Sequence, residues 1–246
     1  MYTAQILSAS QQGDSWMPTL GIQTRKRPVR RMNSAHRQLE IVNAAFDCIA
    51  TTGHLSLSTT ELAYKVGISQ PAIFRHFRSK QQLHQAILDE ANQNVIEELK
   101  LLIGKSELWN NPLNLLQDVA KHMASSFEQA PGVWLTLICQ RSIAAEADIS
   151  DKVEKVVGHK CAITQLTYAL ERLCVAAIEH GQLSNTAKPT DISHSYLALL
   201  FGMGQLWLNN SRDFDLHQRV DFAVKSIVAG YLVDMRHQAV RMSAIA

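Results

Sequence analysis

The stretch from Ser58 to Lys80 constrains the fold of this chain more than any other part of the sequence. Ser58 stands three residues before Glu61, which is the spacing of a capping box that begins a helix. Gly67 allows that helix to end in a sharp turn, because glycine adopts left-handed backbone conformations without a Cβ penalty. Pro71 is tolerated in the first turn of a following helix. The stretch therefore predicts two short helices joined by a glycine turn.

Two further serines are predicted helix caps. Ser69 is expected to cap the second short helix, and Ser79, three residues before Gln82, is expected to begin a third. The spacing of a small residue, Ala63, and an apolar residue, Ile73, around the glycine turn is that of a helix-turn-helix. Such a motif places its second helix in the major groove of DNA.

The outward positions of that second helix carry side chains suited to a duplex. Arginine and glutamine can bind base edges through two hydrogen bonds, and alanine can contact a thymine methyl. Short capped helices with a glycine turn also occur in helical proteins that do not bind DNA. The residues from Arg75 to Lys80 favour the DNA-binding interpretation. The outward positions are Gln70, Ala72, Arg75 and His76.

The run Gly67-Ile68-Ser69-Gln70-Pro71-Ala72-Ile73-Phe74-Arg75-His76-Phe77, followed by Ser79-Lys80, resembles the recognition segment of TetR-family transcriptional regulators. The resemblance covers about residues 36 to 88. Two positions depart from the family pattern: Phe74 replaces a usual tyrosine, and Thr60 replaces a frequent arginine, so two backbone contacts are lost. The DNA contacts that the resemblance implies are Thr59, Thr60, Ser69, Gln70, Pro71, Ala72, Arg75, His76 and Lys80.

Composition and charge agree with a helical DNA-binding protein. Apolar residues make up 46% of the chain, which has only 6 prolines and 11 glycines. This favours a well-packed, helix-rich protein. Residues 1–80 carry a net charge of +6 and residues 81–246 a net charge of −4. The positive charge thus lies on the same part as the helix-turn-helix, as phosphate binding requires.

Other signals predict a cytoplasmic protein, and the resemblance to TetR-family regulators implies a bacterial protein that associates with the nucleoid. No apolar run approaches the length of a membrane span, and the first ten residues do not resemble a secretory signal. Four widely separated cysteines predict free thiols in a reducing compartment rather than a disulfide framework or a zinc site. These are Cys48, Cys139, Cys161 and Cys174.

Three regions are predicted along the chain. Residues 1–34 are polar, lack a helical period and end in a basic cluster from Arg25 to Arg31, which predicts a mostly disordered arm. The arm could lie along phosphates or enter a minor groove, or it could be a solvated tail. Residues 35–82 form the predicted helix-turn-helix domain, and residues 83–246 a helical domain for effector binding and dimerisation.

The hydrophobic periodicity predicts helices throughout. One begins near Ala35 and ends at Gly53, where it would complete a three-helix head. The remaining sequence shows no strand alternation, so we expect an all-α fold: a helix-turn-helix head plus a helical-bundle core. Beyond the helix-turn-helix, the predicted helices span residues 79–103, 112–130, 132–146, 149–181, 189–210 and 213–237.

The segment from Leu197 to Leu208 is apolar on nearly all sides, which predicts burial on more than one face. Gly202 and Gly204 would let another helix approach closely. The resemblance implies dimerisation through the last two long helices, often preceded by a glycine such as Gly181; the alternative is an ordinary core helix. The predicted homodimer interface is Leu200, Gly202, Met203, Leu206, Trp207, Phe222, Ile227 and Tyr231.

The middle of the chain is rich in aromatic and sulfur-containing side chains, which can line an apolar cavity. The resemblance implies a small hydrophobic effector here, although each of these residues could equally belong to the plain core. The predicted pocket residues are Trp109, His122, Met123, Phe127, Trp134, Cys161 and Tyr168.

No sequence motif of an enzyme is present. Gly-x-Ser-x-Gly, His-Glu-x-x-His and Walker-type motifs are absent from the sequence, and its 10 histidines are scattered. We therefore expect neither catalysis nor a metal or cofactor. The resemblance implies a homodimeric transcriptional regulator, which we expect to be a repressor that leaves a palindromic operator when an effector binds. The alternative is a DNA-activated protein-interaction factor that acts on cell division or the nucleoid.

Overall fold

The computed structural model describes residues 34–53, 57–105, 109–139 and 161–232, and these fall within one compact unit that starts at Ser34. The described residues form helices and turns, with one isolated antiparallel bridge between Leu183 and Leu232 and no β-strand. The all-α prediction is therefore confirmed. The predicted basic arm lies outside the described residues, except for Ser34, which begins the first helix.

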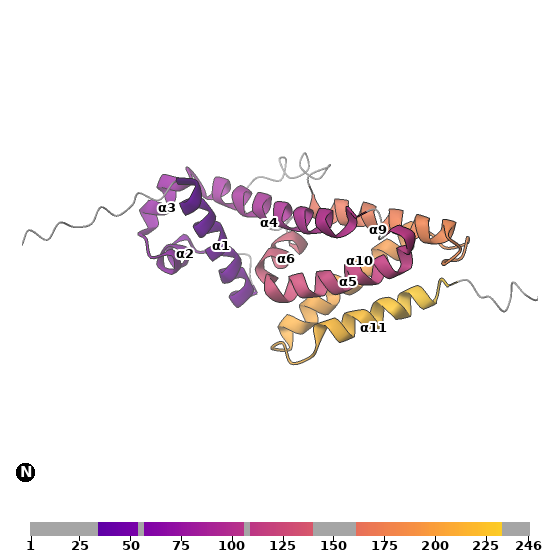
Figure 1. Ribbon diagram of the computed structural model, residues 1–246. Helices are drawn as coiled ribbons and strands as arrows, with labels where there is room; N and C mark the ends of the chain where they lie inside the picture. Colours follow the sequence, from indigo (N-terminus) through magenta and orange to yellow (C-terminus); the bar gives the residue numbers. More distant parts are fainter. Residues whose placement is uncertain (1–33, 54–56, 106–108, 140–160, 233–246) are drawn as a thin grey trace, which may run out of the picture. The chain divides into compact units, whose positions relative to one another are not determined.

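Three helices form the head, as predicted (Figure 1). Helix α1 spans Ser34–Thr52, α2 spans Thr59–Val66 and α3 spans Gln70–His76, and α1 packs against both of the others. Gly67 has a left-handed backbone (φ 72°), which lets Ile68 N–H donate to the carbonyl of Ala63 at 3.0 Å. This reverses the chain between α2 and α3.

Two of the three predicted serine caps are present. The Ser58 hydroxyl accepts from Glu61 N–H at 3.4 Å, and the Ser79 hydroxyl accepts from Gln82 N–H at 3.1 Å. The prediction for Ser69 is wrong, because its side chain makes no capping bond. Pro71 supplies no N–H, and the next N–H, that of Ala72, donates to the Ser69 carbonyl at 2.8 Å instead.

The core is built from the helices that follow the head. Helix α4 spans Lys80–Ile103 and crosses residue 82, where we predicted a domain boundary; it packs against α6 and α9. Helix α10 lies beside α9 and α11, and α5 contacts both α9 and α11 (Figure 1). The other bounds are α5, Pro112–Gln129; α6, Pro131–Ile138; α9, Ala162–Glu179; α10, Pro189–Asn209; and α11, Leu216–Ala229.

Three predicted helices are shorter than expected. The helix predicted over 132–146 ends at Ile138, and the one predicted over 149–181 begins at Ala162, because the backbone of Cys161 is extended. The last begins at Leu216 rather than 213, where Asp215 caps it. It ends at Ala229 because the Tyr231 carbonyl accepts a hydrogen bond from Ser184 N–H at 2.8 Å. Residues 140–160 and 233–246 lie outside the described residues.

Two buried polar side chains in the core, those of Tyr196 and Asn92, form hydrogen bonds to neighbouring helices. The Tyr196 hydroxyl of α10 donates to the Leu116 carbonyl of α5 at 2.6 Å, and complete burial raises the pKa of this tyrosine well above its usual value. Asn92 of α4 accepts from Ala162 N–H of α9 at 2.8 Å. These bonds fix the register of neighbouring helices, because a buried group that lost its partner would remain unsatisfied. No described helix combines the length and the apolar character needed to cross a membrane.

The head and the core meet where α6 packs on α1. Gly132, in the first turn of α6, lies against the backbone of Phe46, and a Cβ at this position would overlap the Phe46 carbonyl oxygen. Glycine is therefore required here by a close approach of two helices rather than by an unusual backbone conformation. Helix α6 also contacts α4, so it joins the head to the core on two sides.

We expect Gly132→Ala to destabilise the protein by about 1–3 kcal/mol, because the added methyl must push α6 away from α1. Urea unfolding at a fixed protein concentration measures this. The control is Gly230→Ala, where the backbone is right-handed (φ −67°) and the nearest atom to an added Cβ is 3.4 Å away. Equal unfolding free energies for the two variants would contradict the tight α1–α6 contact.

Candidate nucleic-acid interface

Helix α3 is anchored by one face and exposed on the other. Ile73 is fully buried in the head, whereas Gln70, Pro71 and Arg75 are exposed. Ala72, together with His76, is half-buried. The structure thus brings the predicted base-contacting side chains onto the outer part of a helix that is held firmly from behind.

The first residues of α2 and α3 are joined by a hydrogen bond. The Gln70 side-chain amide donates to the Thr59 hydroxyl at 2.8 Å. Gln70 thus keeps its carbonyl oxygen and a second N–H for a base edge, which are the two groups that a glutamine uses on adenine. Thr60, the next predicted contact, is exposed, and so is Ser69, directly before Gln70.

The C-terminal end of α3 is held by the start of α1. Gln38 donates to the His76 carbonyl at 2.7 Å, and the His76 Nδ1 lies 3.5 Å from the Ser34 hydroxyl. The contact of His76 with a phosphate stays a prediction.

Three cations at the end of the head and the start of α4 have no ion-pair partner among the described residues: Arg75, Arg78 and Lys80. In contrast, Lys65 of α2 pairs with Asp47 of α1 at 3.3 Å. Lys80 is exposed in the first turn of α4, where the helix dipole also favours an anion. The three unpaired cations are therefore suited to phosphates.

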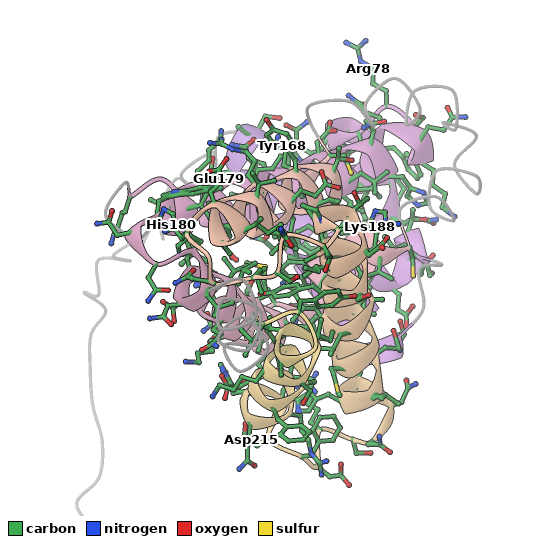
Figure 2. The ribbon with its side chains drawn as sticks, turned by 90° about the vertical axis from the view of Figure 1, so that its right-hand side faces the viewer. Arg78, Tyr168, Glu179, His180, Lys188 and Asp215 are labelled. Atoms are coloured by element: carbon green, nitrogen blue, oxygen red, sulfur yellow. The ribbon has the colours of Figure 1, made fainter. Side chains whose placement is uncertain are left out.

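Our sequence reasoning did not select Arg78. It is exposed, and its side chain extends outward from the ribbon (Figure 2). Its backbone N–H donates to the Gln82 side chain at 2.6 Å, which fixes the chain just before the Ser79 cap. The sequence could have identified Arg78 by its position, because it is a basic residue directly before the capping Ser79 and Lys80.

Comparison with known proteins agrees with this geometry. Residues 41–87 match the family model described as bacterial regulatory proteins, tetR family. The head of this chain is therefore a TetR-family helix-turn-helix domain. The chain is a DNA-binding regulator, and two relatives that match more than three quarters of it are a transcriptional activator and a transcriptional repressor.

Three relatives show the range of TetR-family roles. The transcriptional activator FasR of Mycolicibacterium smegmatis is 21% identical over 79% of this chain and 83% of its own length. The transcriptional repressor BepR of Brucella suis is 24% identical over 76% of this chain and 87% of its own. The nucleoid occlusion factor SlmA of Alteromonas mediterranea is 22% identical, but over only 42% of this chain and 51% of its own.

Solved structures support the fold. SmeT, the repressor of a multidrug efflux pump of Stenotrophomonas maltophilia, aligns with a TM-score of 0.58 at 18% identity, over 80% of this chain and 91% of its own. AibR, solved with isovaleryl coenzyme A and operator DNA, aligns with a TM-score of 0.60 at 19% identity, over 78% of this chain and 98% of its own. The TetR-family fold therefore extends well beyond the matched head.

The predicted effector-pocket residues are only partly brought together. Met123, Phe127 and Trp134 line one core cavity, whose volume of about 10 Å³ has room for about one water molecule. The prediction for Tyr168 is corrected, because its side chain is 63% exposed on α9 (Figure 2). An amphipathic helix with Leu166 and Leu170 on its buried side turns residue 168 outward.

The other three predicted pocket residues do not line this cavity. The Trp109 indole N–H donates to the Ile103 carbonyl at 2.9 Å, and Arg172 covers its ring at 5.1 Å. His122 lies 3.6 Å from Glu98 on α4, and Cys161 is buried at the start of α9.

The predicted dimer residues divide into two groups. Leu200 and Trp207 are buried within their own subunit, where Trp207 packs edge-on against Phe127, so we remove both from the predicted interface. Gly204, also buried, gives the Phe127 ring its space, because an added Cβ would lie 2.5 Å from the ring. Of the remaining predicted residues, Gly202, Leu206 and Phe222 are exposed, and Met203, Ile227 and Tyr231 are half-buried.

We expect Arg75→Ala to weaken binding to a specific site by about 1–3 kcal/mol per half-site, because a base contact is lost. Lys80→Ala should weaken binding to all sequences alike and lower the salt dependence, because a phosphate contact is lost. Fluorescence anisotropy with specific and random DNA over a salt series measures both. Equal losses on the two DNAs for Arg75→Ala would contradict its role as a base contact.

Proposed function

We propose that the protein is a homodimeric repressor that binds a palindromic operator through α3 and is released by a small-molecule effector. The observation that carries the proposal is the exposed face of α3. Gln70 and Arg75 are exposed while Ile73 is buried, and the unpaired cations Arg78 and Lys80 follow them. This arrangement supplies base contacts and phosphate contacts from a single surface.

An apolar surface on α10 and α11 supports the dimer. On α10, Gly202 is exposed, and a Cβ added at this position would have no other atom within 4 Å. Leu206 of the same helix is 52% exposed. On the neighbouring α11, Phe222 is 71% exposed. Pairing this surface with its copy across a two-fold axis would bury all three and form a four-helix bundle. The two α3 helices must then lie about 34–36 Å apart to enter successive major grooves.

The α6 junction offers a route between an effector and DNA. Helix α6 contacts α1, α4 and α5, and the core cavity at Met123 and Trp134 lies between α5, α6, α10 and α11. A ligand that binds better to one arrangement of these helices would shift the separation of the α3 helices. By linkage, operator binding would lower the affinity for that ligand by the same factor. The complex of AibR with both isovaleryl coenzyme A and operator DNA supports a ligand-responsive role.

Two observations favour a second candidate, a DNA-bound factor that acts on the nucleoid or on cell division. The core cavity of about 10 Å³ is too small for an organic ligand. In addition, the match to the nucleoid occlusion factor SlmA covers 102 residues, although only about half of that protein. This candidate predicts many dispersed chromosomal sites rather than a promoter operator.

Selection of genomic fragments by the purified protein, with and without cell metabolites at physiological salt, tests the two candidates. A palindrome in a promoter, lost when a metabolite fraction is added, supports the ligand-controlled repressor. Many dispersed sites that are indifferent to metabolites support the nucleoid candidate. If no sequence is enriched, both candidates fail.

We expect Phe222→Asp to dissociate the dimer and to weaken operator binding about 100-fold or more, because two linked heads bind with an avidity that one head lacks. Sedimentation and anisotropy measure the two effects. The matched control is Leu101→Asp on α4, since Leu101 is 76% exposed but lies outside the proposed interface. A Phe222→Asp protein that remains dimeric would contradict the interface.

A further inference from the structure

A second, much larger space lies outside the core. A cleft of about 460 Å³ opens between the end of α1, at residues 50–53, and the end of α10 with its following turn, at residues 205–212. Leu135 of α6 forms part of its wall. The volume is within the range of small-molecule sites. Most of the cleft's side chains are polar, which favours a polar ligand over the hydrophobic effector predicted for the core.

Arg212 is the charged group of this cleft. No ion pair involves it among the residues that the structure describes. Its guanidinium lies 5.1 Å from the Trp207 ring centroid, and its backbone N–H donates to the Trp207 carbonyl at 2.8 Å. The stacked and tethered guanidinium is thereby held at the edge of the cleft.

The backbone at this turn is strained. Ser211 and Arg212 both have positive φ angles, 55° and 64°, which non-glycine residues rarely adopt. Two consecutive residues of this kind persist only where surrounding contacts hold them, and such residues cluster at ligand-binding turns. Here the strain places Arg212 over Trp207 beside the cleft.

No carboxylate in the described part of the chain lines the cleft beside Arg212. Helices α1 and α10 both end at the cleft, and several carbonyls near these ends accept hydrogen bonds within the chain. Thr51 and Thr52 donate to the carbonyls of Asp47 and Cys48 at 2.7 and 2.9 Å, and Asn210 N–H donates to the Leu206 carbonyl at 3.0 Å. The nearby carboxylates of Asp47, Asp213 and Asp215 do not line the cleft. Because the Thr51 and Thr52 hydroxyls already donate to backbone carbonyls, the groups that the cleft offers an anion are the Arg212 guanidinium and the side-chain amides of Gln205 and Asn209.

We propose that this cleft binds a small polar organic anion, a carboxylate or a phosphate monoester, through Arg212. The ligand would lie against Thr51 on one side and Gln205 on the other, so it would bridge the DNA-binding head to the helix that carries the proposed dimer surface. Its regulatory meaning rests on the proposed function, because fixing α1 relative to α10 sets the positions of the two α3 helices on an operator.

The test uses the full-length protein with succinate and glycerol 3-phosphate as probes and glycerol as the uncharged control. Titration calorimetry measures binding, and tryptophan fluorescence reports on Trp207 beneath the guanidinium. We expect saturable binding of at least one anion and none of glycerol. The preferred anion distinguishes a carboxylate ligand from a phosphate ligand.

Two neighbouring variants locate the site. Arg212→Asn removes the guanidinium with a residue that tolerates a positive φ, and we expect anion binding to weaken about tenfold or more, as for loss of a charged hydrogen bond. Ser211→Asn is the matched control, because it changes the same turn and keeps the guanidinium, so its binding should be unchanged. Equal affinity of Arg212→Asn and the wild type, or no saturable binding of either anion, would overturn the proposal.

The same variants separate this proposal from the proposed function. Without the anion, Arg212→Asn should bind a selected operator as the wild type does, since Arg212 lies outside the DNA-contacting surface. If the protein binds the anion but no operator, the assignment of the cleft as an anion site stands and the proposed function is overturned. Operator binding in the wild type without anion binding would overturn the cleft alone. An operator affinity that the anion changes in the wild type but not in Arg212→Asn supports both.

Discussion

The contact of α6 with α1 is the constraint on which the arrangement of the head depends. Gly132 lets the first turn of α6 rest directly on the backbone of Phe46, with no side chain between the two helices. Close-packed backbones cannot slide past one another by changing rotamers, so movement of α6 must be passed to α1. The same short helix contacts α4, which begins at Lys80 beside the recognition helix. The head is therefore attached to the core by rigid elements rather than by a linker.

Local sequence signals predicted the head well. Gly67 and the caps at Ser58 and Ser79 act within a few residues, so their geometry follows from the sequence around them. The capping rule fails at Ser69. Pro71 has no N–H to donate to the Ser69 hydroxyl, and the next N–H, that of Ala72, donates to the Ser69 carbonyl instead. The Gln70–Thr59 bond could not be predicted in the same way, since it joins residues on two helices whose crossing must first be known.

The core was predicted less completely because its faces are set by distant partners. Helix α10 is apolar on nearly all sides, so its sequence does not distinguish the side that meets Phe127 from the side left on the surface. Trp207 and Gly204 belong to the first side, and Gly202 and Leu206 to the second. The turn that places Arg212 beside α1 has no sequence signature, because Ser211 and Arg212 are not residues that usually adopt a positive φ.

The bond between Gln70 and Thr59 has a consequence for how the protein searches DNA. A free glutamine side chain samples many rotamers, and ordering it at an interface costs about 0.5–1.5 kcal/mol. In this head the loss of rotamer freedom has already occurred during folding, so it is not incurred again at each site that the protein visits. A head with an ordered glutamine can therefore test a base step in one encounter and move on quickly when the step does not match.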